Sequence, residues 1–366
     1  MTKYKLGEIC EIVSGSTPKT GIAEYWGGEL KWITPAEISE DSYIITDSVR
    51  KLTELGIKKT GLTPLPKGTV ILSSRAPIGK VAIAGCEMYC NQGFKNLICT
   101  KKINNRYLYW FLKGNTAYLN SLGRGATFKE ISKQIVSGIE INVPDMNQQM
   151  QAVENLEKVW RIIQLRKQEL QKGDELIKAR FVEMFGDPVY NTNYLPIRNL
   201  NELGSWASGG TPSRTVPEYF KGNIDWYSAG ELNTLFLEGS VEKITEEAIE
   251  KSATKLFKAG SLLIGMYDTA AFKMGILKED SASNQACACI TPNDEVNIIW
   301  LYYELQMMKE HFLSQRRGVR QKNLNLGMIK AFKIPITKRE QQDEFSDFVK
   351  QVDKSKVTKQ IDSHIS

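Results

Sequence analysis

The sequence predicts an α+β protein in which two similar, α/β-mixed domains are separated by long antiparallel coiled-coil helices and related by a pseudo-twofold axis. Three observations predict it. The 366 residues suffice for two domains, the second half repeats the first, and two stretches have helical periodicity without proline. The predicted segments are a first domain at 1–146, a long helix at 147–186, a second domain at 187–338 and a shorter helix at 339–366.

The internal repeat is clearest at an offset of 194 residues. Residues 6–38 and 200–232 share 11 identities in 33 positions, among them Trp32 with Trp226. The match continues at an offset near 193, pairing Asn91-Gln92 with Asn284-Gln285, Arg124-Gly125 with Arg317-Gly318, and Gln148-Gln149 with Gln341-Gln342. A period this long indicates a duplicated domain and is too long for a solenoid unit.

Each copy combines short strands with a few helices. Runs such as GTVILSS, GKVAIAG and KNLICT in copy one, and GSLLIGMYD and ACACITP in copy two, are rich in β-branched residues and bounded by glycine or proline. Such runs predict strands. One short helix is predicted near 104–113 and its partner near 297–309. Mixed small sheets with few helices indicate an α+β domain.

The segment 147–185 predicts a long helix, because it contains no proline and one glycine, Gly173. One heptad position holds Val153, Trp160, Lys167, Asp174 and Phe181, and the other holds Leu156, Ile163, Leu170, Ile177 and Met184. The second position is apolar in all five heptads, as in a coiled-coil seam. Gly186-Asp187-Pro188 is a stop signal.

The second helical segment, 339 to about 360, is shorter and its heptads are weaker. Two related helices of one chain pack most simply antiparallel, which would place the domains at opposite ends. The sequence therefore favours a device that holds two similar domains at a fixed separation. The alternative is an ordinary duplicated protein whose helices only pack its domains together.

Composition excludes several classes. The chain has neither a signal-peptide pattern nor 18 consecutive apolar residues, so we expect a cytoplasmic protein without a membrane span. The six cysteines form no C-x-x-C pair, which favours structural thiols over a metal site. A net charge of +6 permits a polyanionic partner without requiring one.

Catalytic motifs are poorly represented. Asp187-Pro188-Val189-Tyr190 lacks the second proline of an adenine methyltransferase loop and follows a helix stop. The segment 76–80 (APIGK) lacks the upstream glycine and the Ser/Thr of a phosphate-binding loop. No acid-x-Lys follows Pro144-Asp145 as a nuclease would require, and there is no nucleophile elbow or zinc His-Glu-x-x-His. We expect a chain with no catalytic residues and no metal site.

Nucleic-acid binding is better supported, because basic and amide side chains gather in corresponding segments of both copies. Arginine and lysine can read guanine, asparagine and glutamine can read adenine, and lysine contacts to phosphate position the protein. The candidates are Arg75, Lys80, Asn91, Gln92, Lys95, Arg124, Thr127 and Lys129 in copy one, and Lys273, Asn284, Gln285, Arg316, Arg317, Arg320, Gln321 and Lys322 in copy two. Each alone is better explained as a solvated loop charge, and the Asn-Gln pairs equally well as turn braces, so that only the clustering in both copies favours nucleic-acid contact.

Four features of the chain resemble the specificity (S) subunit of type I restriction–modification enzymes. They are the L-x-E…S-G-x-T-P…E-Y-[WF]…G…W start, the G-K-x-A…N-Q-G segment, the R-G-A-T-like motif and a helix opening at Gln-Gln. The resemblance covers nearly the whole chain. Copy two departs from it at Tyr267-Asp268-Thr269, where copy one has Arg75-Ala76-Pro77, and at Phe272-Lys273-Met274, where copy one has Gly79-Lys80-Val81. The second helix is shorter than the first.

The resemblance implies two target-recognition domains, each reading one half of a bipartite double-stranded DNA site, with helices that set the spacing. It also implies no catalysis and no cofactor in this subunit. Two methylation subunits using S-adenosylmethionine and two restriction subunits using ATP and Mg would join it. Two other classes stay open: a non-catalytic two-domain protein-binding scaffold, and a single-chain restriction or methylation enzyme.

Overall fold

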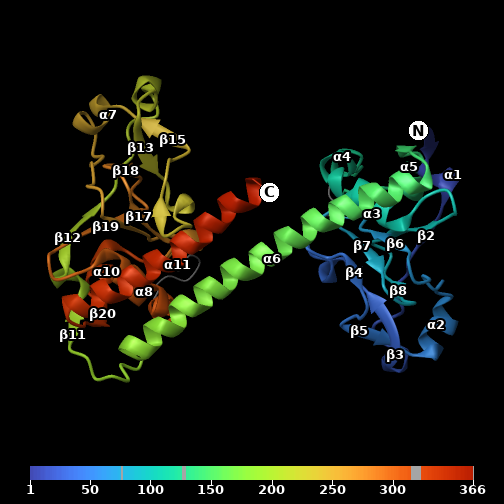
Figure 1. Cartoon of the computed structure of the whole chain (residues 1–366), viewed down its shortest axis with the longest axis horizontal. Helices are drawn as coiled ribbons and strands as arrows, with labels where there is room; N and C mark the ends of the chain where they lie inside the picture. Colours follow the sequence, from blue (N-terminus) through green and yellow to red (C-terminus); the bar gives the residue numbers. More distant parts are fainter. Residues whose placement is uncertain (76, 126–128, 315–322, 366) are drawn as a thin grey trace. The chain divides into compact units, whose positions relative to one another are not determined.

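The computed structural model describes residues 1–75, 77–125, 129–314 and 323–365. The chain divides into two units, Met1–Leu165 and Arg166–Ser366, and the division falls inside the long helix α6, Met146–Phe185 (Figure 1). Each unit has hydrophobic clusters of its own. Helix α6 contributes residues to both units.

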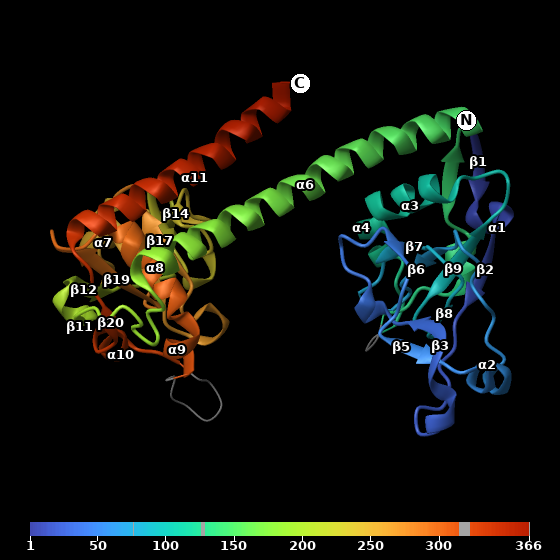
Figure 2. The same cartoon turned by 60° about the horizontal axis from the view of Figure 1, so that its bottom comes forward.

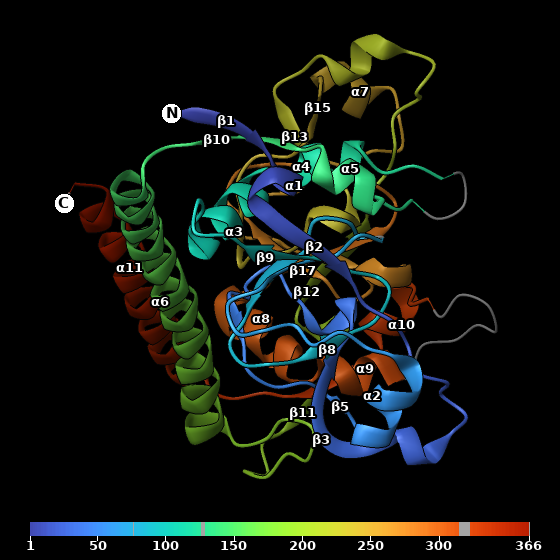
Figure 3. The same ribbon diagram turned by 90° about the vertical axis from the view of Figure 1, so that its right-hand side faces the viewer.

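The described part of unit 1 contains a five-stranded sheet of order β2-β9-β6-β7-β4, a three-stranded sheet β5-β3-β8 and the ribbon β1-β10. Figure 3 shows the ribbon near the N-terminus. The strands are β1 Thr2–Lys5, β2 Cys10–Ser14, β3 Trp26–Ile33, β4 Ile44–Ile45, β5 Arg50–Leu52, β6 Val70–Leu72, β7 Val81–Ala84, β8 Tyr89–Cys90, β9 Lys95–Cys99 and β10 Glu140–Val143. The helices are α1 Leu6–Ile9, α2 Glu54–Thr60, α3 Asn105–Gly114, α4 Thr116–Ser121 and α5 Lys133–Ser137.

Unit 2 repeats this topology strand for strand: β12-β19-β16-β17-β14, β15-β13-β18 and β11-β20. The strands are β11 Ile197–Asn199, β12 Gly204–Ser208, β13 Ile224–Tyr227, β14 Phe236–Leu237, β15 Glu242–Ile244, β16 Leu262–Gly265, β17 Met274–Leu277, β18 Ala282–Ser283, β19 Cys287–Pro292 and β20 Lys333–Pro335. The helices are α7 Glu246–Glu250, α8 Ile298–Met307, α9 Lys309–Ser314, α10 Leu326–Lys330 and α11 Arg339–Ile365. The predicted duplication and mixed α/β fold class are confirmed.

The predicted strands and short helices are present. The runs GTVILSS, KNLICT and GSLLIGMYD contain β6, β9 and β16, and β6 and β16 are buried along their whole length. Helices α3 and α8 match the two expected helices. Asn104 and Asn297 cap them by accepting hydrogen bonds from the N–H groups of Arg106 (2.9 Å) and Ile299 (3.0 Å).

The repeated Gln-Gln pairs fasten the long helices to their domains. The amide oxygen of buried Gln149 accepts from the Asn104 N–H at 2.8 Å, and its amide nitrogen donates to the Pro144 carbonyl at 2.9 Å. Gln342 does the same with Asn297 (2.8 Å) and Thr337 (2.9 Å). Both copies therefore begin their long helix on the same buried amide.

The N-terminal half of α6 packs on unit 1 through an aromatic contact. The rings of Trp160 and Tyr43 lie 5.4 Å apart, and Tyr43 also packs against Tyr109. On the preceding turn of α6, Glu157 accepts a hydrogen bond from the Tyr43 hydroxyl and pairs with Arg106 at 3.2 Å. These contacts fix the start of α6 on the first domain.

In unit 2 the C-terminal part of α6 packs beside α11 (Figures 1 and 2). Phe181 lies 5.3 Å from Phe345 between ring centroids, and Arg180 pairs with Glu344 at 3.0 Å. Burial raises the pKa of the Tyr302 hydroxyl, a hydrogen bond with Gln306 lowers it, and the charges of Asp174, earlier on α6, and Asp353, later on α11, both raise it. Positions earlier on α6 therefore correspond to positions later on α11, so the two helices are antiparallel in unit 2, as predicted.

The predicted heptad seam is buried at Val153, Ile177 and Phe181 and largely exposed between Val153 and Ile177. Ile177 and Phe181 are fully buried, and burial of each such side chain stabilises the fold by about 1.5–3 kcal/mol. Leu156, Ile163 and Leu170 are 43%, 47% and 48% exposed. Ile177 and Phe181 are buried because they belong to the hydrophobic cluster of unit 2, to which Leu156, Ile163 and Leu170 do not belong.

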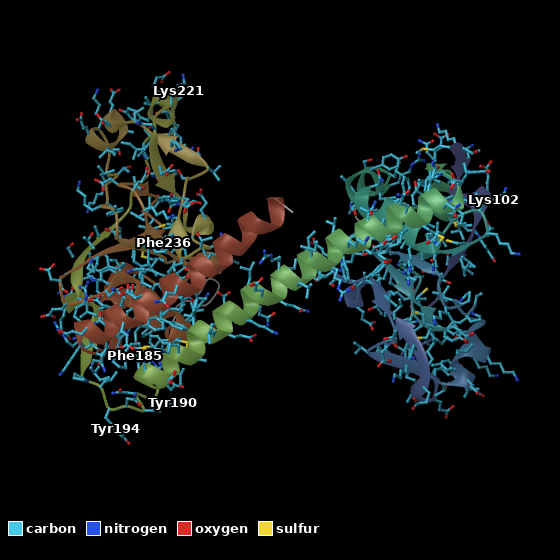
Figure 4. All side chains as sticks on the ribbon, viewed as in Figure 1. Lys102, Phe185, Tyr190, Tyr194, Lys221 and Phe236 are labelled. Atoms are coloured by element: carbon cyan, nitrogen blue, oxygen red, sulfur yellow. The ribbon has the colours of Figure 1, made fainter. Side chains whose placement is uncertain are left out.

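The chain passes from buried to exposed residues directly after α6. Phe185 is buried against Phe345, whereas Tyr190 and Tyr194 point away from unit 2 and are 80% and 92% exposed (Figure 4). The helix stops where predicted, because Gly186 adopts a left-handed φ of +77° that favours glycine.

Candidate nucleic-acid interface

The opening S-G-x-T-P turn has the same contacts in both copies. The indole N–H of Trp32 donates to the Ser16 carbonyl at 3.1 Å, and that of Trp226 donates to the Gly210 carbonyl at 2.9 Å. Both indoles are buried. Each tryptophan therefore fixes the turn from beneath.

The turn in each copy holds a glutamine of the repeated Asn-Gln pair. The hydroxyl of Thr17 donates to the amide oxygen of Gln92, and Thr211 donates to that of Gln285. Both glutamines are exposed, and no described residue accepts from either side-chain nitrogen. A glutamine fixed through its oxygen presents its amide donors outward, as base-edge reading requires.

The asparagines brace the same loop. Asn91 accepts from the Gly93 N–H at 2.9 Å, and Asn284 accepts from the Ala286 N–H at 3.0 Å. These are Asx-type turns, which the sequence allowed as one explanation of both pairs. The asparagine oxygens are therefore committed to loop geometry.

Lys80 and Lys273 occupy equivalent places although their neighbours differ. Lys80 donates to the Pro35 carbonyl at 3.1 Å, and Lys273 donates to the Gly230 carbonyl at 3.3 Å. Gly79 and Phe272, the residues that precede them, share left-handed φ angles of +92° and +59°. Copy two thus reproduces the backbone with a phenylalanine, a conformation that costs a non-glycine residue on the order of 1–2 kcal/mol.

A charged network exists in copy one alone among the described residues. Lys95 is 7% exposed, and its ammonium lies 3.2 Å from Glu130, which also accepts from Arg75 at 2.9 Å. The strand register places Lys95 opposite Ser14 and Ala288 opposite Ser208, so alanine replaces the lysine in copy two. Arg75 and Lys95 are therefore held by one carboxylate.

The pKa of Glu130 reflects this pairing. Burial is the largest influence and acts to raise the pKa, but hydrogen bonds and charge from Arg75 and Lys95 outweigh it, and the pKa lies below its ordinary value. Lys95 also donates to Ser74 at 3.4 Å, and the Ser74 N–H donates to the Gly93 carbonyl at 2.8 Å. The network therefore adjoins the Asn91-Gln92 turn.

The remaining candidates divide by whether the structure describes them. Arg124 and Lys129 are exposed, and the Arg124 backbone pairs with Glu130 through hydrogen bonds of 3.0 and 2.9 Å. Thr127, Arg316, Arg317, Arg320, Gln321 and Lys322 lie outside the described residues.

Sequence reasoning missed a second duplicated loop, S-V-x-K, at 48–51 and 240–243. Its signal was a match at an offset of 192, with seven identities in 12 positions between residues 48–59 and 240–251, which a search at an offset of 194 does not detect. Ser48 and Ser240 each accept the backbone N–H of the buried tryptophan, Trp32 or Trp226, at 2.9 Å. The loop therefore packs on the strand that also fixes the S-G-x-T-P turn.

Metal-ligating side chains do not cluster. Within the described ranges, no three His, Cys, Asp or Glu side chains are placed to hold a metal ion. The six cysteines are free thiols, and burial raises the pKa of Cys90 and Cys289 to about 12. No helix in the described ranges has the length and apolarity needed to cross a membrane.

Comparison with solved structures shows the same fold. The S subunit of a type I restriction–modification system from M. genitalium superimposes with a TM-score of 0.60 at 14% identity, covering 99% of this chain and 91% of that one. A chain from a structure of the type I R-M system, described for its complex assembly and conformational transition, gives 0.54 at 17% identity over 98% and 91%.

Sequence relatives point the same way. The chain is 38% identical over 184 residues to the type I restriction enzyme MjaIX specificity subunit of Methanocaldococcus jannaschii, which is 50% of this chain and 42% of that protein. It is 27% identical over 145 residues to the EcoR124I/EcoR124II specificity subunit of Escherichia coli, 38% and 36% respectively. The matches thus span less than half the length of these relatives.

The family profile covers most of the chain. The type I restriction modification DNA specificity domain matches residues 1–172 and again 196–366, once for each copy of the duplicated fold. On this match, together with the duplicated topology, the chain belongs to the type I restriction–modification DNA specificity family.

Proposed function

We propose that this chain is the DNA-reading subunit of a type I restriction–modification assembly, in which each copy reads one half of a bipartite duplex site. The observation that carries the proposal is the Thr17–Gln92 contact and its repeat at Thr211–Gln285. The same turn presents an exposed amide in both copies, while the side chains around it differ, with Lys95 in one and Ala288 in the other. One scaffold with two different surroundings suits two different half-sites.

The proposal assigns different tasks to the candidate residues. Gln92 and Gln285 contact base edges, and the exposed Arg124 and Lys129 contact phosphates. Asn91, Asn284, Lys80 and Lys273 shape the loops, because their polar atoms already bond to backbone groups. Thr127, Arg316, Arg317, Arg320, Gln321 and Lys322 remain candidate contacts.

The long helices set the distance between half-sites and dock the methylation subunits. The antiparallel contact of α6 with α11 in unit 2 and the exposed aliphatic residues in the middle of α6 support this role. Two half-sites about one helical turn apart, near 34 Å, would place both domains on one face of DNA. Two methylation subunits with S-adenosylmethionine, and restriction subunits with ATP and Mg, complete the proposed assembly.

The chain itself is proposed to be non-catalytic and to bind no cofactor. The sequence lacks the Asn/Asp-Pro-Pro-aromatic loop and the glycine-rich turn that adenine methylation requires. Adenine methylation should therefore be absent from the purified chain and should require the added methylation subunit. S-adenosylmethionine binding by the isolated chain would instead support a single-chain enzyme.

The test is selection from a randomised duplex library by the purified chain, alone and with its methylation subunit, with competitor DNA and a salt titration. The expected result is a split motif, two short blocks around a fixed random gap, with binding that weakens steeply as salt rises. An active, folded complex that enriches no motif would contradict DNA reading. Salt-insensitive binding to proteins would favour the scaffold alternative.

A further inference from the structure

The S-V-x-K loop is built in the same way in both copies. Ser48 donates to the Arg50 carbonyl at 2.7 Å, and Ser240 donates to the Glu242 carbonyl at 2.6 Å. The backbone N–H of the valine donates to the carboxylate of a half-buried glutamate at 2.8 Å in each copy. Val49 donates to Glu37, and Val241 donates to Glu231. These bonds hold the loop in one conformation.

The loop presents side chains that the core does not use. Val49 is 85% exposed and Val241 is 87% exposed. A rigid loop that holds an aliphatic side chain in solvent at the same place twice has no packing reason to do so. The residue after each valine lies on the same exposed edge and is the point at which the copies differ.

Copy one places a guanidinium on an aromatic platform. The Arg50 guanidinium carbon lies 3.5 Å from the ring centroid of Trp26 and 5.4 Å from that of Trp32. The two rings meet edge to face at 5.0 Å. Stacking fixes the plane of the guanidinium and leaves its edge N–H groups directed outward.

In copy two, an arginine from a different segment of the chain lies above the aromatic rings. Glu242 takes the position of Arg50, since each lies opposite its copy's buried tryptophan in the antiparallel strand pair. The guanidinium above the rings comes from Arg214, at 4.2 Å from Phe220 and 5.3 Å from Trp226. Glu242 holds it with two hydrogen bonds of 2.5 and 2.7 Å.

The two platforms therefore differ in charge. Arg214 and Glu242 form a bidentate ion pair with no net charge. Within the described residues no carboxylate lies in ion-pair distance of Arg50. An unpaired cation fixed on an exposed platform suits an anionic ligand, whereas a neutral pair does not.

The Arg50 platform is continuous with the candidate interface. Trp32, beneath Arg50, donates to Ser16, and the next residue, Thr17, holds Gln92. We propose that Arg50 binds a DNA backbone phosphate beside the half-site read by copy one, and that the Arg214–Glu242 pair deprives copy two of this contact. The inference rests on the proposed function and names a contact at the variable position of the S-V-x-K loop, where the two copies differ.

The experiment compares the wild type with four variants of the full chain, each in complex with its methylation subunit, on the selected duplex. The observed binding constant is measured against salt, because each phosphate contact contributes about 0.9 to the logarithmic slope. Arg50→Gln should make the slope shallower by about 0.9, so that raising salt from 50 to 200 mM costs about 3.5-fold less affinity than in the wild type. Arg50→Lys retains the charge and should keep most of the slope.

The matched controls lie in copy two. The double variant Arg214→Gln/Glu242→Gln removes a neutral pair and should leave the slope unchanged, whereas Glu242→Gln alone frees Arg214 and should steepen it by about 0.9. Thermal unfolding of every variant separates lost binding from lost folding. An unchanged slope in folded Arg50→Gln would overturn the inference while leaving the proposed function intact. Salt-independent binding by the wild type would overturn the proposed function itself.

Discussion

The ammonium of Lys95 lies 3.2 Å from the carboxylate of Glu130, and the lysine side chain is almost entirely buried. Burying a lysine is costly unless its charge is paired, so Glu130 is required where Lys95 is present. The same carboxylate holds Arg75, which is half exposed. The pair therefore links the interior of copy one to its surface.

Glu130→Gln should destabilise unit 1, because it leaves the buried Lys95 ammonium unpaired. Breaking a buried pair costs about 3–5 kcal/mol; the partial exposure of Glu130 screens the interaction and reduces the expectation to about 1–3 kcal/mol. Urea unfolding measures the change. Glu140→Gln, which removes an exposed pair with Lys3, is the control and should unfold like the wild type. Equal effects in the two variants would contradict the assigned role of burial.

The same carboxylate should contribute to acid stability. The pKa of Glu130 is lowered in the folded chain, so its contribution is full above the unfolded value of about 4.3 and is lost as pH falls through the folded value. The stability difference between wild type and Glu130→Gln should therefore shrink as pH falls below about 4. Unfolding measured from pH 7 to pH 3 tests this, and a difference that grows in acid would refute the pairing.

Gln149→Ala should cost about 2–4 kcal/mol, because it strands a backbone N–H at Asn104 and a carbonyl at Pro144 in the interior. Gln342→Ala should behave alike in copy two. Gln148→Ala removes the exposed neighbour and is the matched control. A Gln148 variant as destabilised as the Gln149 variant would show that the helix start, and not the buried amide, is responsible.

The duplicated fold and the long helix were predictable, because an offset of 194 and a proline-free heptad run are properties of the chain itself. The predicted strands are confirmed in β6, β9 and β16. Side-chain roles were harder to predict. Lys95 and Arg75 could not be recognised as partners of Glu130, because Glu130 is 55 residues from Arg75 in the sequence and only the fold brings them together.

The Asn-Gln pairs illustrate the same limit. Their repetition indicated a shared role, but the different roles of the asparagine and the glutamine depend on local geometry. Asn91 accepts a hydrogen bond from Gly93 within the turn, whereas Gln92 is exposed. The equivalence of Arg50 and Arg214 could not be recognised in the sequence, because the two arginines do not align in the repeat. Each lies above the corresponding aromatic ring of its own copy.

Gln92→Ala should weaken binding to the selected duplex by about 2- to 12-fold, the equivalent of one hydrogen bond from the amide nitrogen to a base edge, about 0.5–1.5 kcal/mol. It should relax one sequence block, and Gln285→Ala should relax the other, because the two glutamines belong to different copies. Repeating the library selection with each variant measures this. Asn91→Ala is the contrast and should lower the unfolding temperature, since it removes a turn brace. Relaxation of the same block by both glutamine variants would contradict one half-site per copy.

Glu304 should oppose folding at neutral pH. It is 1% exposed, one carboxyl oxygen has no hydrogen-bond partner, and burial raises its pKa well above the ordinary value, whereas the equivalent position of copy one holds Phe111. A carboxyl with a raised folded pKa lowers stability as pH rises above its unfolded value of about 4.3. Glu304→Met should therefore stabilise the chain by about 1–3 kcal/mol at pH 7 and by less at pH 4. Glu310→Gln, on the exposed face of α9, should change neither value. Urea unfolding at both pH values decides the point: a gain for Glu304→Met that is as large at pH 4 as at pH 7 would locate its effect in packing and not in the buried charge.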